Sequence, residues 1–194
     1  VAVDLDAQLI VFCGVGFMGE SAKILSPHKT VLMPAADADC PMAHMASPET
    51  IEKVRAEYDD LAVVCYINST AELKKYSDVC VTSSNAVKIV KNLPNKNIFF
   101  IPDRNLGSYV AKQCPDKNFI FNNGCCPRHV VITKDMVLKA KELHPEARFA
   151  AHPECTEDVL AFADYVGSTS GIIDYVVDTD ADEYIIGTVD HSDR

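Results

Sequence analysis

Residues 61–81 read LAVVCYINSTAELKKYSDVCV, and this stretch decides the fold. The run at 61–67 is apolar without interruption, which is typical of a strand buried on both faces of a sheet. Helical spacing follows at 70–76, and a second short apolar run occupies 78–81. Parallel strands need a crossover connection, usually a helix, so this order predicts a strand–helix–strand unit with parallel strands.

The same alternation runs along the whole chain. Strands are predicted at 9–13, 30–33, 61–67, 78–81, 97–101, 118–121, 148–151, 164–166 and 184–186. Helices are predicted at 18–25, 48–58, 70–76, 84–92, 106–113, 134–143 and 155–163. Ser47 before Pro48, and Thr133, are typical N-cap residues at two of the helix starts. The sequence therefore predicts an α/β fold with small parallel sheets.

Composition and charge argue against a protein that binds nucleic acid or a membrane. The chain has 194 residues, 48% of them hydrophobic, and a formal net charge of −10. This negative charge argues against binding to nucleic acid or to an anionic membrane surface. No apolar run approaches the roughly 18 residues that a membrane-spanning helix needs, and the first residues lack the pattern of a signal peptide. We expect a cytoplasmic protein.

The eight cysteines fall into two groups. A disulfide framework is typical of small secreted scaffolds, so free thiols in a reducing compartment are favoured here. Cys13, Cys65 and Cys80 lie in apolar runs and are expected to be buried core residues. Cys40 and Cys126 instead precede prolines in predicted loops, which singles them out as candidates for chemistry.

An internal repeat emerges when the chain is shifted by 86 residues. The matching pairs are Cys40-Pro41 with Cys126-Pro127, Ser47 with Thr133, Tyr66 and Asn68 with His152 and Glu154, Asp78 with Asp164, and 82–84 (TSS) with 168–170 (STS). A partial third copy is predicted at 10–25, which has the same strand–turn–helix form as 78–90 and 164–176. We therefore expect three α/β units, at 1–38, 39–124 and 125–194, with both outer units cut short.

Three such units predict a shared metal site. Each unit offers one Cys-Pro loop, and the third cysteine is expected beyond Arg194, at about position 212 by the same period. Three thiolates around a pseudo-threefold axis suit an iron–sulfur cluster with one open iron, or a zinc ion with an open position. Three readings remain open at this point: an iron–sulfur enzyme, a zinc-dependent lyase or hydrolase, and a non-catalytic fragment.

Several motifs together resemble one known family. They are VFCGVGFMGESAKIL (11–25), DADCPMA (37–43), YINSTAELKKYSDVCVTSSNA (66–86), IPDRNLG (101–107), CPRH (126–129), AHPEC (151–155) and GSTSGII (167–173). In order and in content they are similar to quinolinate synthase, the A protein of NAD biosynthesis. The resemblance implies three homologous three-layer αβα units around a [4Fe–4S] cluster. It also implies a transferase that condenses iminoaspartate with dihydroxyacetone phosphate to quinolinate, losing phosphate and water, and a functional link to L-aspartate oxidase or dehydrogenase.

The resemblance also implies a set of site residues. Cys40 and Cys126 match cluster ligands, with the cluster's open iron acting as a Lewis acid. The positions matching substrate contacts are Tyr66, Asn68, Ser83, His129, His152, Ser168 and Thr169. Glu154, His152 and Tyr66 match catalytic acids and bases.

Some positions depart from the family pattern. Cys125 and Cys155 align with Asp39 and Ser69 in the repeat, so neither is expected to be a ligand. Asp39 stands where the family has glycine, and Val189 ends a Gly-Thr-Val sequence where the family has Gly-Thr-Glu. The family's segment before Val1, with a histidine and a tyrosine, and its third ligand cysteine are expected to lie outside this chain.

Overall fold

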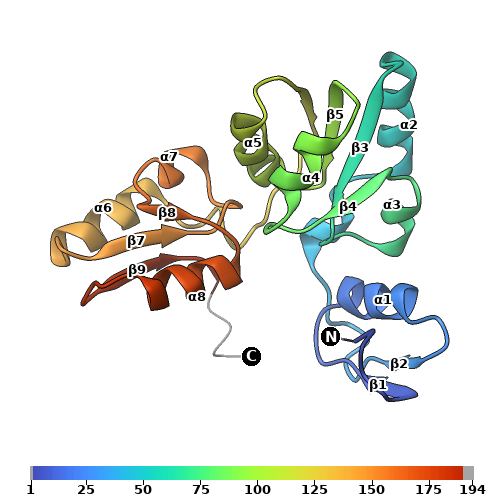
Figure 1. Ribbon diagram of the computed structural model, residues 1–194, viewed down its shortest axis with the longest axis horizontal. Helices are drawn as coiled ribbons and strands as arrows, with labels where there is room; N and C mark the ends of the chain where they lie inside the picture. Colours follow the sequence, from blue (N-terminus) through green and yellow to red (C-terminus); the bar gives the residue numbers. More distant parts are fainter. Residues whose placement is uncertain (1, 190–194) are drawn as a thin grey trace.

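The computed structural model describes residues 2–189 and places three small parallel sheets one after another along the chain (Figure 1). The first pairs β1 (Leu9–Val11) with β2 (Thr30–Leu32). The second has the order β4-β3-β5-β6, from β3 (Leu61–Tyr66), β4 (Val79–Val81), β5 (Asn97–Ile101) and β6 (Asn118–Phe121). The third has the order β8-β7-β9, from β7 (Arg148–Ala151), β8 (Tyr165–Val166) and β9 (Tyr184–Gly187). The predicted α/β fold with parallel sheets is confirmed.

Helices connect the strands, within each sheet and from one sheet to the next. They are α1 (Gly16–Leu25), α2 (Pro48–Glu57), α3 (Ala71–Lys75), α4 (Ala86–Asn92), α5 (Arg104–Gln113), α6 (Lys134–Leu143), α7 (Glu157–Leu160) and α8 (Thr169–Asp178). Ser47 and Thr133 cap α2 and α6 as predicted, because their hydroxyls accept the backbone N–H of Thr50 and Met136. A short 3₁₀ helix, η1 (Pro41–His44), was not predicted and directly follows Cys40.

The central sheet has a core on each face, which explains the uninterrupted apolar run of β3. Every residue of β3 is buried. Val64 and Phe100 point into the core cluster on one face of the sheet, and Val63 and Phe99 into the cluster on the other. A strand packed on both sides gains from apolar residues at every position, so the usual alternation is absent.

The 86-residue correspondence between the second and third units is confirmed in the strand pairing. Val64 pairs with Val79 in the second unit, and Ala150 pairs with Tyr165 in the third, both shifted by 86. Likewise, Ala62 pairs with Ile98 in the second unit and Arg148 with Tyr184 in the third, again shifted by 86.

Side-chain bonds repeat as well, and they explain the recurring aspartates. Asp78 accepts the backbone N–H of Val63 at 2.7 Å, and Asp164 accepts that of Phe149 at 2.8 Å. Both aspartates therefore act as structural ties between neighbouring strands.

The match proposed for the first unit was wrong. Residues 10–25 do not correspond to 78–90, because β1, α1 and β2 reproduce β5, α5 and β6 instead. Leu9 pairs with Thr30 and Asn97 with Asn118, at the same separation along the chain. Strand–turn–helix is too common a form to fix the register by itself, and the pairing of β1 with the strand after its helix decides the matter. The unit boundaries at residues 38 and 124 stay a prediction.

The burial predicted for two cysteines was also wrong. Cys13 and Cys80 are exposed, whereas Cys65 is buried as expected. Cys80 lies on β4, an edge strand of the central sheet, and Cys13 follows a strand of a sheet with only two strands. Apolar flanks therefore do not ensure burial at the margin of a small sheet.

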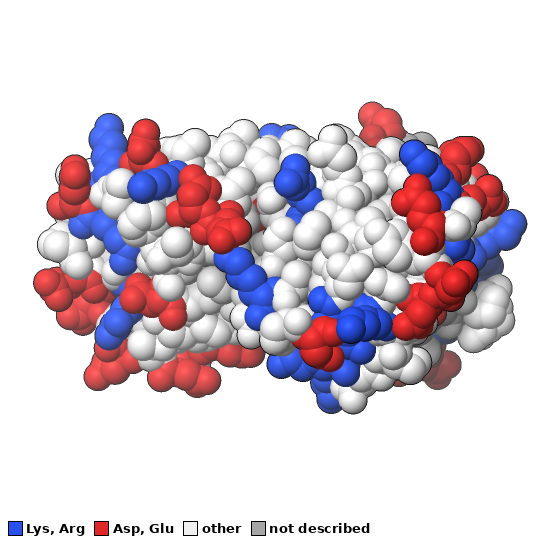
Figure 2. Space-filling model, turned by 90° about the horizontal axis from the view of Figure 1, so that it is seen from above, with Lys and Arg blue, Asp and Glu red and all other residues white. Residues whose placement is uncertain are grey.

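The surface carries both signs of charge. In Figure 2, acidic and basic side chains are interspersed over the face in view, with uncharged areas between them. In the described part of the chain, no helix has the length and apolar character needed to cross a membrane.

Candidate active site

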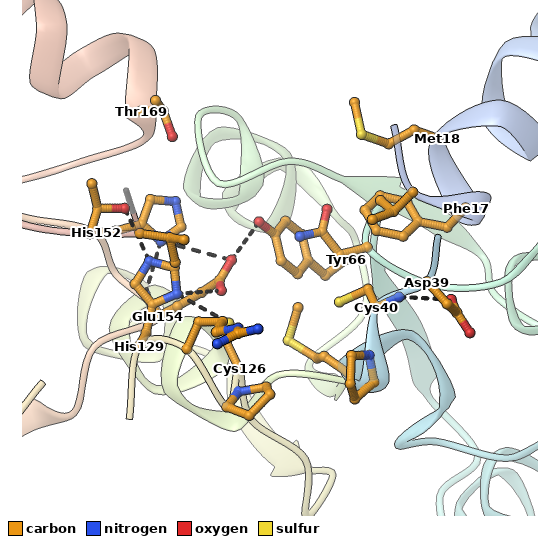
Figure 3. Close-up of a pocket in the computed structure, with 18 residues that line it drawn as sticks. Phe17, Met18, Asp39, Cys40, Tyr66, Cys126, His129, His152, Glu154 and Thr169 are labelled. Atoms are coloured by element: carbon orange, nitrogen blue, oxygen red, sulfur yellow. Dashed lines mark hydrogen bonds and ion pairs between the residues drawn. The ribbon is translucent and has the colours of Figure 1, made fainter. Parts of the chain in front are cut away.

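A cavity of about 570 Å³ opens where the three units meet, and each unit supplies part of its wall (Figure 3). Phe17 and Met18 come from α1, and Tyr66 comes from the end of β3. His152 and Glu154 follow β7. The carboxyl ends of parallel strands are where α/β folds bind their ligands, and the cavity occupies that position.

Two cysteine loops enter the cavity with matching local structure. Cys40 precedes η1 and its carbonyl accepts the N–H of Ala43, just as the Cys126 carbonyl accepts the N–H of His129, 86 residues later. Both sulfur-bearing side chains line the cavity, Cys126 buried and Cys40 half-buried. The proline after each cysteine starts the turn because its fixed φ suits the first helical position.

Asp103, which sequence reasoning missed, anchors the Cys126 loop. This fully buried residue accepts the N–H of Cys126 and, as the N-cap of α5, the N–H of Leu106, both at 2.8 Å. Burial and the charge of Glu154 raise the pKa of Asp103 to about 7. The signal was present in the sequence, since aspartate before a helix is a common N-cap, but its second partner is remote in the chain.

Glu154 is the centre of a buried hydrogen-bond network. Its Oε1 accepts the hydroxyl of Tyr66 at 2.7 Å, and its Oε2 lies 3.0 Å from Nδ1 of His129. Burial alone would raise the pKa of Glu154, but the hydrogen bond from His129 and the nearby His152, with the Tyr66 hydroxyl, lower it to about 2. Glu154 is therefore a carboxylate at neutral pH.

The two histidines differ in their surroundings. Their rings stack with centroids 4.9 Å apart. His129 contacts Thr188 through Nε2 at 3.1 Å and the sulfur of Cys126 through Nδ1, also at 3.1 Å. Burial lowers the pKa of His152 to about 4, so this ring is neutral at pH 7. Burial and Glu154 raise the pKa of Tyr66, which keeps its hydroxyl protonated.

Cys126, His129 and Glu154 are grouped closely enough to hold a metal ion. Their potential ligand atoms lie within 4.8 Å of one another, and all three side chains are buried. Burial and the neighbouring Glu154 raise the pKa of the Cys126 thiol to about 12, so metal binding there would have to displace its proton. Cys155 is different, because its thiol donates to the carbonyl of Gly187 and its side chain is fully buried in the third unit's core.

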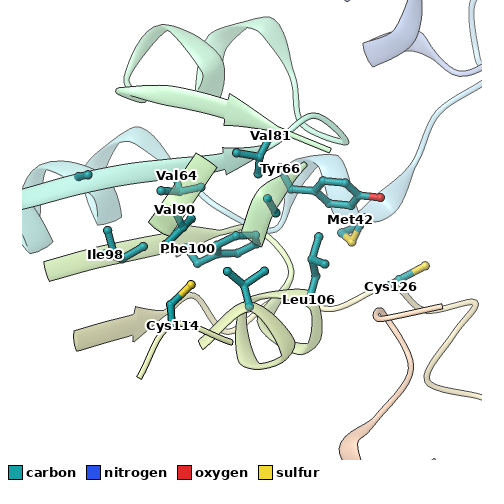
Figure 4. Close-up of a cluster of buried hydrophobic side chains, with 13 residues drawn as sticks. Met42, Val64, Tyr66, Val81, Val90, Ile98, Phe100, Leu106, Cys114 and Cys126 are labelled. Carbon is teal, nitrogen blue, oxygen red and sulfur yellow. The ribbon is translucent and has the colours of Figure 1, made fainter. Parts of the chain in front are cut away.

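The apolar core of the second unit reaches this site. Figure 4 shows Met42, Tyr66 and Cys126 at one end of a cluster that also contains Phe100 and Leu106. Side chains held by a close-packed core have little freedom to reorient. The cavity wall formed by the second unit is therefore rigidly supported.

Most predicted site residues meet in the cavity, and two do not. Those lining it are Cys40, Tyr66, Asn68, Cys126, His129, His152, Glu154 and Thr169. Ser83 and Ser168 are not part of the lining, and Ser168 caps α8 by accepting the N–H of Gly171. Arg128 and Thr188 also line the cavity, although the sequence analysis did not select them.

Known proteins resemble this chain along almost its whole length. The family model described as "Quinolinate synthetase A protein" matches residues 1–191. The chain belongs to this family. It is 54% identical over 188 residues to a quinolinate synthase from Caldicellulosiruptor saccharolyticus, covering 97% of this chain and 62% of that protein. It is 56% identical over 187 residues to a quinolinate synthase from Fusobacterium nucleatum, covering 96% of this chain and 62% of that protein.

A third quinolinate synthase, from Clostridioides difficile, is 50% identical over 188 residues, again across 62% of its length. This member of the quinolinate synthetase A family therefore spans about three-fifths of the length of these curated relatives. The resemblance inferred from the motifs is confirmed at the level of the family.

Proposed function

We propose that the protein containing this chain is a quinolinate synthase, which condenses iminoaspartate with dihydroxyacetone phosphate and releases phosphate and water. Membership of the family supports this. The single observation that carries the proposal is the shared cavity, in which two Cys-Pro loops face Tyr66, His129 and Glu154. Small polar substrates fit a cavity of this size, and no nucleic-acid or membrane partner is proposed.

The donor set fits an iron–sulfur cluster held in part by this chain. Cys40 and Cys126 come from equivalent loops and line the same cavity, and soft thiolate ligands favour such clusters. Cys40 and Cys126 would hold a [4Fe–4S] cluster together with a third cysteine outside this chain. When bound, the cluster would supply an open iron that acts as a Lewis acid toward oxygen atoms of the substrate.

The chain's own residues would accept and donate protons during the reaction. Glu154, a carboxylate at neutral pH, can accept a proton, and the neutral ring of His152 can do so as well. The protonated hydroxyl of Tyr66 can donate one. Because Tyr66 and His129 both bond to Glu154, a proton gained at one of them can be shared within the network.

Other residues would hold the substrates. Iminoaspartate carries two carboxylates, and dihydroxyacetone phosphate carries a phosphate. Arg128 offers a guanidinium at the cavity wall, suited to paired oxygens. Asn68 and Thr169 offer neutral donors. We keep Ser83 and Ser168 as predicted substrate contacts, since each follows a strand next to the cavity residues. A cytoplasmic location and supply of the imine by an L-aspartate oxidase or dehydrogenase complete the proposal.

The test is the metal content and activity of the full gene product purified without oxygen. We expect iron and acid-labile sulfide in equal amounts, and formation of quinolinate from the two substrates. Cys126→Ser should lose the cluster and the activity, whereas Cys125→Ser, the neighbouring thiol, should keep both. Zinc instead of iron would favour the lyase or hydrolase reading, and absence of both metal and activity would favour a non-catalytic protein.

A further inference from the structure

A second pair of cysteines lies outside the cavity, on the central sheet. Cys65 of β3 and Cys80 of β4 are directly paired in the parallel register. Paired residues on neighbouring strands point to the same face of the sheet, and parallel strands lie about 4.8 Å apart. Disulfides join Cα atoms about 4.4–6.8 Å apart, so this pairing brings the two thiols within bridging range.

The two thiols have unequal environments. Cys65 is fully buried in the core beneath α2 and α3, whereas Cys80, on the edge strand, is exposed. A hydrogen bond with Cys65 lowers the pKa of Cys80 to about 7, against the effect of burial and with a contribution from the charge of Lys74. For Cys65, the hydrogen bond with Cys80 and the burial of the side chain both raise the pKa. Cys80 is thus the exposed and more acidic thiol of the pair, and Cys65 is the buried one.

The third unit shows that the fold does not require thiols here. At the equivalent positions, Ala151 of β7 pairs with Val166 of β8 in the same register. These two apolar residues hold the same strand pair together without any sulfur. The cysteines of the second unit therefore add a chemical property to a position that a plain apolar pair satisfies.

We propose that Cys80 and Cys65 form a peroxide-responsive dithiol, in which Cys80 is the attacking thiolate and Cys65 the resolving thiol. The Cys80 thiolate attacks one oxygen of hydrogen peroxide, the O–O bond breaks, and the leaving hydroxide takes up a proton to become water. Sulfur of Cys65 then attacks the resulting sulfenic acid; the S–S bond forms, the S–O bond breaks, and a second water leaves. Two thiols and one peroxide give one disulfide and two waters.

A disulfide at this position would constrain the segments that follow the two strands. Tyr66 directly follows Cys65, and Val81 after Cys80 leads into the loop at 82–84. A covalent link would tie an edge strand to the central strand next to both segments. Lys74, which contributes to the environment of Cys80, also donates to Ser21 of α1 at 2.8 Å, so the dithiol lies near the contact between α3 and α1 in Figure 1.

The experiment treats the purified chain with one equivalent of hydrogen peroxide, blocks free thiols with iodoacetamide, and maps its peptides by mass spectrometry. We expect a peptide pair linked through Cys65 and Cys80, cleaved by reductant. In a parallel measurement on untreated protein at pH 7, Cys80 should be alkylated faster than Cys13, the other exposed cysteine chosen as reference.

Variants distinguish the two roles. Cys65→Ser, which keeps a hydroxyl donor beside Cys80, should leave Cys80 as a sulfenic acid that dimedone traps, and Cys80→Ser should leave Cys65 reduced. The double variant C65A/C80V, which copies the pair of the third unit, should fold normally and form no such linked peptide. The proposal is overturned if Cys80 is alkylated no faster than Cys13, if wild-type Cys80 stays a sulfenic acid, or if Cys80 links only to a second copy of the chain. None of these readouts depends on the proposed enzyme activity.

Discussion

Replacing Asp103 with alanine tests whether the Cys126 loop is anchored from a distance. In the structure, one carboxylate serves two backbone N–H groups, those of Leu106 and Cys126. Removing it deletes the N-cap of α5, which costs about 1 kcal/mol in typical helices. It also leaves the buried N–H of Cys126 without its acceptor, which costs about 1–3 kcal/mol.

The sum predicts that Asp103→Ala lowers the free energy of unfolding by about 2–4 kcal/mol. Loss of the repulsion between Asp103 and Glu154, which contributes to the raised pKa, acts in the opposite direction and favours the lower end of this range. The matched control is Thr133→Ala. Thr133 caps α6, a helix of the same length, but its side chain accepts only the exposed N–H of Met136. This control should lose only the cap term, about 1 kcal/mol.

The assay is equilibrium unfolding in urea at constant pH, with the midpoints of both variants compared with wild type. A second readout is the alkylation rate of Cys126, which should rise in Asp103→Ala and stay unchanged in Thr133→Ala. Equal losses of stability in the two variants, with no change in Cys126 reactivity, would refute the anchoring role.

Three further predictions concern carboxylates that accept hydrogen bonds. Tyr66→Phe should lower the free energy of unfolding by about 1–3 kcal/mol and raise the pKa of Glu154, measured by carboxyl NMR, because the carboxylate loses a buried donor. Since the pKa of Glu154 falls from 4.5 to about 2 on folding, its stabilisation is present above pH 4.5 and lost as the pH falls through 2; unfolding of wild type and Glu154→Gln should therefore converge toward low pH. Asp78→Ala and Asp164→Ala should cost similar amounts, about 1–2 kcal/mol each in urea unfolding, since both remove the acceptor of the same strand tie; clearly unequal losses would contradict the equivalence.

The sequence predicted the elements well because their signals are local. Uninterrupted apolar runs identified the buried strands, and Ser47 and Thr133 identified helix starts within one residue. The repeat was equally readable for the second and third units, where Asp78 and Asp164 keep their spacing. A shift that superposes several residue types in register constrains three-dimensional structure more than any single motif does.

What the sequence could not predict depended on contacts between remote segments. The exposure of Cys80 follows from the place of β4 at a sheet edge, which no local pattern specifies. The role of Asp103 needs the Cys126 loop to fold back on the start of α5. Arg128 lines the cavity together with residues that are remote in the chain, such as Phe17 and Tyr66. In each case the deciding partner lies far along the chain or in another unit.

The two cysteine loops differ in the residue that accepts the backbone N–H of the cysteine. In both, the first N–H of the preceding helix bonds back to the loop, Gly16 to the carbonyl of Ala38 and Arg104 to that of Gly124. The N–H of each loop cysteine, Cys40 and Cys126, then needs an acceptor. Cys40 finds it in the adjacent, exposed Asp39 at 2.7 Å, whereas Cys126, preceded by Cys125, depends on the remote and buried Asp103.

This exchange involves the two positions that the repeat aligns, Asp39 and Cys125. In this chain, the residue before Cys40 supplies that acceptor itself. For Cys126 the acceptor is Asp103 of the second unit, so Cys125 does not have to accept that N–H. The position equivalent to Asp103 in the first unit is Val15, the N-cap of α1, which cannot accept a hydrogen bond through its side chain. A carboxylate therefore holds each cysteine N–H, and only its position in the chain has changed.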